Sequence, residues 1–405
     1  MPPSIVINDI IIKYDNIIPS MNKAFLVLAI IKLLLVPSIV NAKNNVIFGG
    51  FSFGSILPEN TISNGIFKEN GGLLYINKLL VDKTKEITNE SFSINFELLK
   101  DEANEEDQNI LVLALDNEYI NNVSIPGDNL TRTDIILNFQ IIFFNAKNNF
   151  LTASIPLEIS KNISSAEKLS KSQIKTELKK IYENEVLKYY FELLNNFTLK
   201  SKFKNRIGIT EVIFEDNAKQ KFKESLNEKD IFLKNKFAKS LSSFIAFNND
   251  IAIVPYGQDR TTNTLMLRFE NTQREIKLPN PDYHIYLTIR GFKNVLFKEG
   301  NIDEQWIYGS FVNIKVVQPD NPDENLKIKM DEKFKHGLNV ELSKRSLENK
   351  ESFEWIFFND SLKVLFDNFS KQTIEFDKKW IKSSSDSKKM KKKFEGLKNI
   401  YESCK

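Results

Sequence analysis

Cysteine and histidine are almost absent from this sequence. Its 405 residues include one cysteine, Cys404, and two histidines, His284 and His336. A disulfide framework within the chain and a cysteine-based zinc site are therefore excluded, and no ligand cluster has zinc-like spacing. The phosphate-loop pattern G-x-x-x-x-G-K-S/T and a G-x-G-x-x-G after a strand are also missing. We expect no cofactor and no metal site.

Glycine is scarce (14 residues) whereas phenylalanine is frequent (32), so the chain is not a flexible or fibrous polymer. Its 41% hydrophobic and 27% charged residues are typical of globular domains, and its length suffices for two or three cores. The 56 basic and 53 acidic residues nearly cancel, leaving +3. Nucleic acid usually requires a concentrated basic surface, so we expect no nucleic-acid partner.

Residues 21–42 have the parts of a secretory signal peptide. Lys23 precedes an apolar run that ends at Pro37, and Val40-Asn41-Ala42 supplies a cleavage site. The alternative is a single membrane-spanning helix over residues 24–40, which is short and carries Lys32 near its centre. Residues 1–20 are apolar rather than basic, and we interpret them as a non-native or untranslated preface before a start at Met21. We therefore expect a periplasmic or secreted protein, with an inner-membrane anchor as the alternative.

The following segment, residues 43–165, is predicted to be a first α+β domain. It contains strand patterns at 46–53 and 110–115, a helical pattern at 73–85, and a hairpin of 134–144 with 150–159. A helical connector, 166–203, comes next. Ser170 and Gln173 resemble a capping box, and apolar residues at helical spacing predict an amphipathic helix over roughly 171–198.

Residues 204–382 are predicted to be a second α+β domain with a similar order of elements. Strand patterns are found at 206–214, 250–257, 264–271, 274–297 and 305–320, and helical patterns at 233–245 and 338–372. Residues 383–405 are expected to be a basic, flexible tail. The overall prediction is an α+β fold: two mixed, sandwich-like domains with antiparallel hairpins, joined by a long amphipathic helix, and related as a degenerate repeat.

This element order resembles that of small α+β domains in bacterial envelope assembly proteins, such as the amino-terminal domain of TolB-type proteins and curli secretion lipoproteins. The resemblance rests on element order alone, and a shared fold does not by itself imply a shared function.

One stretch matches a catalytic pattern. Gly50-Phe51-Ser52-Phe53-Gly54 fits G-x-S-x-G, which places a nucleophilic serine in many hydrolases. A helix should follow the serine, but Pro58 and turn residues do, and only His284 or His336 could act as the base. We therefore prefer a structural interpretation, in which Phe51 and Phe53 face a core and Ser52 lies on the outward face of a strand or at a bulge. No catalytic residue is assigned.

Other features favour structural roles. The acidic stretches 101–107 and 320–324 lack the glycine and closing glutamate of a calcium loop. The tail lysines could contact anionic lipid or nucleic acid, and Cys404 could form an intermolecular disulfide; the lysines are Lys388, Lys389, Lys391, Lys392 and Lys393. Tyr283, Tyr286, Trp306 and Tyr308 could form an aromatic partner-binding surface across a hairpin. The favoured hypothesis is an exported, non-enzymatic protein that contacts a protein partner in the envelope; the alternatives are a serine hydrolase using Ser52 and a membrane-anchored protein.

Overall fold

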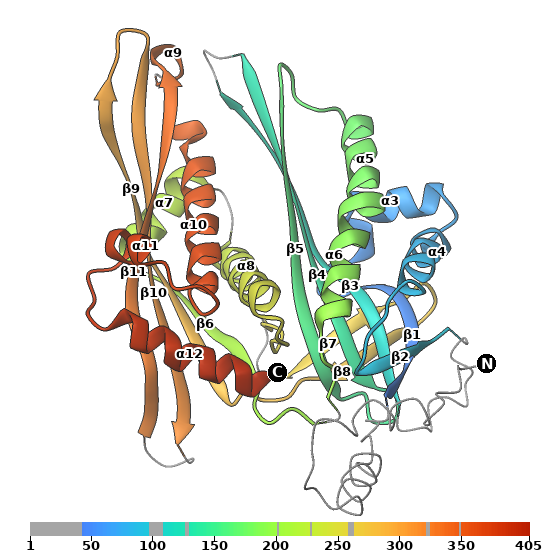
Figure 1. Cartoon of the computed structure of the whole chain (residues 1–405). Coiled ribbons are helices and arrows are strands. Elements are labelled where there is room, and N and C mark those ends of the chain that lie inside the picture. Colours follow the sequence, from blue (N-terminus) through green and yellow to red (C-terminus); the bar gives the residue numbers. More distant parts are fainter. Residues whose placement is uncertain are drawn as a thin grey trace, which may run out of the picture. The chain divides into compact units, whose positions relative to one another are not determined.

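A computed structural model describes residues 43–96, 108–125, 129–200, 202–226, 229–257, 263–320, 325–347 and 350–405 (Figure 1). The chain divides into two units, Met1–Ala42 and Lys43–Lys405, and all described residues belong to the second. The predicted preface, the export signal, the acidic stretch 101–107 and residues 321–324 lie outside the described residues.

The first half of this unit combines a mixed sheet with helices. Its elements are β1 (Asn44–Phe53), η1 (Pro58–Asn60), α3 (Ile62–Glu69), α4 (Leu73–Thr84), β2 (Phe92–Asn95), β3 (Asn109–Ile125), β4 (Leu130–Asn145), β5 (Leu151–Ser165), α5 (Lys171–Lys180), a π-helical segment η3 (Ile181–Val186) and α6 (Leu187–Asn196). The predicted first strand, the helix at 73–85 and the hairpin are confirmed, and the strands are longer than predicted.

The first sheet has the strand order β5-β4-β3-β1-β7-β8, and β2 pairs with the start of β1. Strands β7 (Thr264–Arg268) and β8 (Gln273–Lys277) come from the second half of the sequence, and β7 joins the sheet through the pair Phe53–Arg268. The strands predicted at 264–271 and 274–297 therefore do not all serve the second half: β7 and β8 belong to the first sheet. The sheet curls until Lys277 meets the β4–β5 turn, where its N–H donates to the Asn149 carbonyl at 2.8 Å.

The long connector helix is confirmed and packs on the first sheet. Ser170 caps α5, and its capping box with Gln173 is formed. Along this face the ring of Tyr182 contacts Phe51, Phe67 and Phe139 at centroid distances of 5.1–6.4 Å. Burial of these aromatic groups holds α5, η3 and α6 against β1 and β4.

The second half has its own four-stranded sheet and helices. Besides β7 and β8, its elements are β6 (Ile207–Phe214), α7 (Asp216–Ser225), α8 (Asp230–Asn249), β9 (Tyr283–Glu299), β10 (Asp303–Asp320), β11 (Asn325–Ser343), α9 (Lys344–Leu347), η4 (Lys350–Ser352), α10 (Glu354–Lys371), α11 (Lys378–Ser384) and α12 (Met390–Cys404). The strand order is β11-β10-β9-β6. This confirms the α+β class with antiparallel hairpins.

Three expectations for this half are corrected. The segment 250–257 is not a ladder strand: it is extended, with Ile253 donating to Ser154 of one sheet and Val254 to Ile207 of the other. Residues 338–343 belong to β11 rather than to a helix, and α10 begins only at Glu354. The tail is not a flexible end, since α12 buries Phe394, Leu397 and Tyr401 among others.

The two halves repeat the same topology. In each, a first strand (β1 or β6) is followed by helices and then by an antiparallel meander (β3-β4-β5 or β9-β10-β11) whose first strand lies parallel to it. A helix that packs on the sheet follows, α5–α6 in one half and α10 in the other. The sequence hypothesis of a repeat thus holds at the level of strand order.

Three of the bulges repeat as well, whereas a further bulge at Phe297 of β9 has no counterpart in the first sheet. The first strand skips one residue against the meander at Gly49 in one half and at Thr210 in the other. The first strand of the meander bulges at Asp116 in one half and at Arg290 in the other. Asp116 lies five residues after Leu111, the partner of Phe48, and Arg290 lies five residues after Ile285, the partner of Ile209. The third bulge lies at Thr152 or Lys329. Because a bulge re-aims every side chain after it, matching bulges give a residue-by-residue correspondence of the two sheets.

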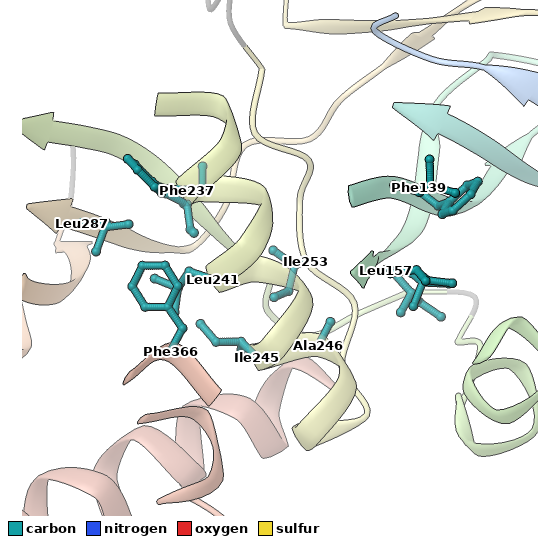
Figure 2. Close-up of a cluster of buried hydrophobic side chains, with 14 of the residues drawn as sticks. Phe139, Leu157, Phe237, Leu241, Ile245, Ala246, Ile253, Leu287 and Phe366 are labelled. Carbon is teal, nitrogen blue, oxygen red and sulfur yellow. The ribbon is translucent and has the colours of Figure 1, made fainter. Parts of the chain in front are cut away.

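A single apolar core runs through both halves. Figure 2 shows Leu241 and Ile245 of α8 beside Phe366 of α10, with Ile253 between them and Leu157 of β5. A second, smaller cluster lies inside the curl of the first sheet, formed by Ile110, Val112, Ala114, Ile142, Phe144, Ala146, Leu151, Leu265, Leu267, Ile276 and Leu278.

Candidate functional site

Each sheet has an inner face, which carries the residues of the continuous core, and an outer face on the other side. In the first sheet the outer face is covered. One end is closed by β7 and β8, and the rest packs against α8 and α10 through ion pairs. We call these contacts the polar layer; its charged members are Asp116, Arg132, Asp134, Glu158, Lys239, Asp360 and Lys363.

The first link of the polar layer joins the β3 bulge to α8. Lys239 Nζ lies 3.0 Å from Asp116 Oδ2, and both side chains are almost fully buried. The other oxygen, Oδ1, accepts from the Ser55 N–H at 3.0 Å and the Ser55 hydroxyl at 2.9 Å. Burial alone would raise the pKa of the Asp116 carboxyl, but the Lys239 charge and the Ser55 hydrogen bonds lower it below the ordinary value.

Two further links join the first sheet to α10. Lys363 Nζ lies 2.8 Å from Glu158 of β5. Arg132 of β4 binds both carboxylate oxygens of Asp360 at 2.7 and 2.9 Å, and its Nε donates to Asp134 at 2.6 Å. The charges are paired across the layer, which fixes how the helices of the second half lie on the first sheet.

Among the residues that the structure describes, none forms such a cover over most of the outer face of the second sheet. Helices α8 and α10 lie on one side of this sheet only (Figure 1). Along residues 331–340 of β11, exposed residues alternate with neighbours that face inward. The exposed residues of this stretch are Asp331, Lys333, Lys335, Gly337 and Asn339. A groove of about 440 Å³ runs along this face, and its lining includes Arg290, Phe311, Asn313, Lys333, Lys335 and the 384–387 turn.

This uncovered face is basic. Arg290 Nε is 3.9 Å from the half-exposed Glu215, and Lys335 is 3.6 Å from the fully exposed Asp386, so both pairs are weak. Lys315 and Lys333 form no ion pair with any residue in the described ranges. The β11 sequence carries the signal for this, since lysines flank the apolar residues of "KIKMDEKFK", but no strand is predicted there from the sequence.

The same face is flat and apolar toward the end of the β9–β10 hairpin. Gly309 pairs with Gly337 in the ladder. A Cβ on Gly337 would approach Ile307 to 2.8 Å, and one on Gly309 would approach the Phe311 ring to 3.3 Å. The glycines thus let Ile307 and Phe311 lie flat over the sheet, beside the exposed Val295.

The residues of the hydrolase hypothesis are not brought together. Ser52 lies in β1 of the first sheet and is fully buried, beside Ala114 on the outer face and beneath the curl. Ser52 thus lies on the face opposite to Phe51 and Phe53, as predicted, but that face is covered; the neighbouring bulge is at Gly49. His284, bonded to Thr210 at 2.9 Å, and His336 belong to strands of the second sheet. His336 is a β11 residue, and burial lowers the pKa of its imidazole.

The predicted aromatic surface does not form either. Tyr283 and Tyr308 are buried in the core, and Trp306 packs under the Lys350 side chain at 4.0 Å. Tyr286 alone lies on the outer face, where it pairs with Lys315. Cys404 is buried, and burial raises the pKa of its thiol to about 12, so it is unsuited to an intermolecular disulfide. Of the tail lysines, Lys391 and Lys393 pair with Glu395 and Glu332.

Comparison with known proteins adds little. No protein-family model matches the sequence, and neither does any curated protein. Among solved structures, the chain is similar to a hypothetical protein, CT253, from Chlamydia trachomatis, at 9% identity and a TM-score of 0.22. The match covers 41% of this chain and 96% of that chain. A likeness at this level carries no argument about the function of this chain.

Proposed function

We propose that this is an exported, non-enzymatic protein of the cell envelope that acts by binding a protein partner. The observation that carries the proposal is the uncovered basic outer face of the second sheet. The corresponding face in the first half is the outer face of the first sheet, and it packs against β7, β8, α8 and α10. Surfaces that are partly apolar and rimmed by charge are typical of protein contacts.

Two observations support export. The boundary between the two units falls between Ala42 and Lys43, where the sequence predicts cleavage of the signal. β1 begins at Asn44, whose side-chain amide donates to the Ser91 and Leu199 carbonyls, so cleavage after Ala42 would leave every described strand and helix whole. In the described ranges, no helix has the length and apolar character needed to cross a membrane.

Fractionation of cells that make the protein, combined with mass spectrometry of its amino terminus, tests this proposal. We expect the protein in the periplasmic or secreted fraction with Lys43 as its first residue, and we expect chemical cross-linking in those cells to join it to another protein. Detection of peptides from residues 1–42 in the native protein would contradict cleavage. Repeated recovery of the cross-linked protein as a lone monomer would contradict a partner.

A further inference from the structure

We propose that the outer face of the second sheet binds a helix of another protein, and that this helix presents carboxylates to Arg290 and Lys335. This inference rests on the proposed function and names the chemistry of the partner. It follows from the repeat, because the first half shows what a sheet of this kind holds on its outer face.

In the first half the occupants of that face are helices. α8 and α10 lie across it through three charged links. In one, Arg132 of the sheet binds Asp360 of α10; in the other two, the sheet supplies the acid, at the bulge residue Asp116 and the β5 residue Glu158. Each position receives one lysine, Lys239 at 3.0 Å or Lys363 at 2.8 Å. The recognition is therefore one charge from the sheet against one opposite charge from a helix.

The corresponding positions of the second sheet carry the opposite sign. Asp116 corresponds to Arg290, because each is the bulge residue of the first meander strand. Phe139 and Val312 are equivalent, because each pairs with the residue just before the bulge, Leu115 or Ile289. Glu158 follows the β5 partner of Phe139, and Lys335 follows the β11 partner of Val312, so Glu158 corresponds to Lys335. A helix that carries Asp or Glu would complete here the pairing that Lys239 and Lys363 complete in the first half.

The surroundings add to the positive charge. Lys333 lies on the same face two residues before Lys335, and Lys315 lies on it between Tyr286 of β9 and Asp331 of β11. The single acid among the groove's exposed strand positions, Asp331, accepts from the Asn313 amide at 2.9 Å. The flat stretch over Gly309 and Gly337 gives an apolar surface for the helix's own apolar residues. An amphipathic helix with an acidic flank thus matches both the charge and the apolar end of the face.

Tyr286 is the position from which to capture the partner, because it lies on this face and an aromatic cross-linker replaces it with little change. We would introduce benzoylphenylalanine at position 286, irradiate cells that make the full chain, and map the joined peptide. We expect a peptide of another protein that is rich in Asp and Glu and has helical spacing of its apolar residues. The double variant Lys333→Glu/Lys335→Glu should reduce the yield by about tenfold or more, since two attractions become repulsions.

The control is Lys68→Glu/Lys78→Glu, which makes the same change of net charge at two exposed lysines of α3 and α4. It should leave the yield unchanged. Replacing the captured carboxylates by lysine should restore the yield with Lys333→Glu/Lys335→Glu, an outcome that a misfolded variant cannot give. The inference would be overturned by capture of a basic peptide, of lipid or nucleic acid, or of a second copy of this chain. Export and partner binding are tested separately, by the fractionation and cross-linking described above. An unchanged cross-linking yield in the Lys333→Glu/Lys335→Glu variant would overturn the inference as well.

Discussion

We expect Lys239→Met to lower the free energy of unfolding of the mature chain by about 3–5 kcal/mol, the cost of leaving one member of a buried ion pair without its partner. Met fills a similar volume, so the loss comes from Asp116, which stays buried with only Ser55 to bind it. Urea unfolding at pH 7 measures the effect. The double variant Asp116→Asn/Lys239→Met should recover much of the loss, because it removes the unpaired charge.

The matched control is Lys219→Met, whose partner Asp216 is fully exposed; a surface pair of this kind contributes at most about 1 kcal/mol. The pH dependence has a definite sign. The pKa of Asp116 is lowered in the folded state, so its pairing stabilises the fold above the unfolded value of about 3.9. That stabilisation is lost as the pH falls through the folded value. If Lys239→Met matched the control, the polar layer would not hold the two halves together.

We expect Phe394→Ala to lower the free energy of unfolding by about 3–5 kcal/mol, as for other buried aromatic residues. Phe394 is 1% exposed, and its ring contacts those of Phe334, Phe369 and Phe376 at 5.5–6.2 Å. Its loss would open a cavity between α12, β11 and α10. Thermal or urea unfolding of the variant measures the effect.

Lys398→Ala is the control for Phe394→Ala, because Lys398 is an exposed residue of the same helix. It should change the free energy of unfolding by less than about 0.5 kcal/mol. Deletion of residues 390–405 should be more damaging still, since it uncovers the Phe334 and Trp380 rings. A deletion variant as stable as the full chain would show that the segment is the flexible tail that its composition suggests.

The elements with strong local patterns could be predicted from the sequence. The β4–β5 hairpin is rich in β-branched and aromatic residues on either side of a polar turn, and Ser170 with Gln173 marks the start of α5. α12 was missed because its lysines dominate the composition, although Phe394, Leu397 and Tyr401 have the three- and four-residue spacing of a helix face. β11 was missed for a related reason, as its alternating lysines are the mark of a two-faced strand rather than of a solvated turn.

The arrangement of the site could not be predicted. Local pattern identifies β7 and β8 as strands but does not specify that β7 pairs with β1, about 200 residues earlier in the chain, and carries β8 into the first sheet. The pairs Asp116–Lys239 and Glu158–Lys363 likewise join residues that are far apart in sequence, and nothing distinguishes these four among 109 charged residues. The repeat became definite only from the register, because the bulges coincide where the residue types do not.

The measurement that tests the central claim most directly is lysine footprinting in intact cells compared with the purified protein. A small amine-reactive reagent should modify Lys315, Lys333 and Lys335 readily in the purified protein and far more slowly in cells, because a partner covers the outer face of the second sheet. Lys68 and Lys78 should react equally in both samples. Equal modification of Lys333 and Lys335 in cells and in the purified protein would contradict the claim that this face is a contact surface.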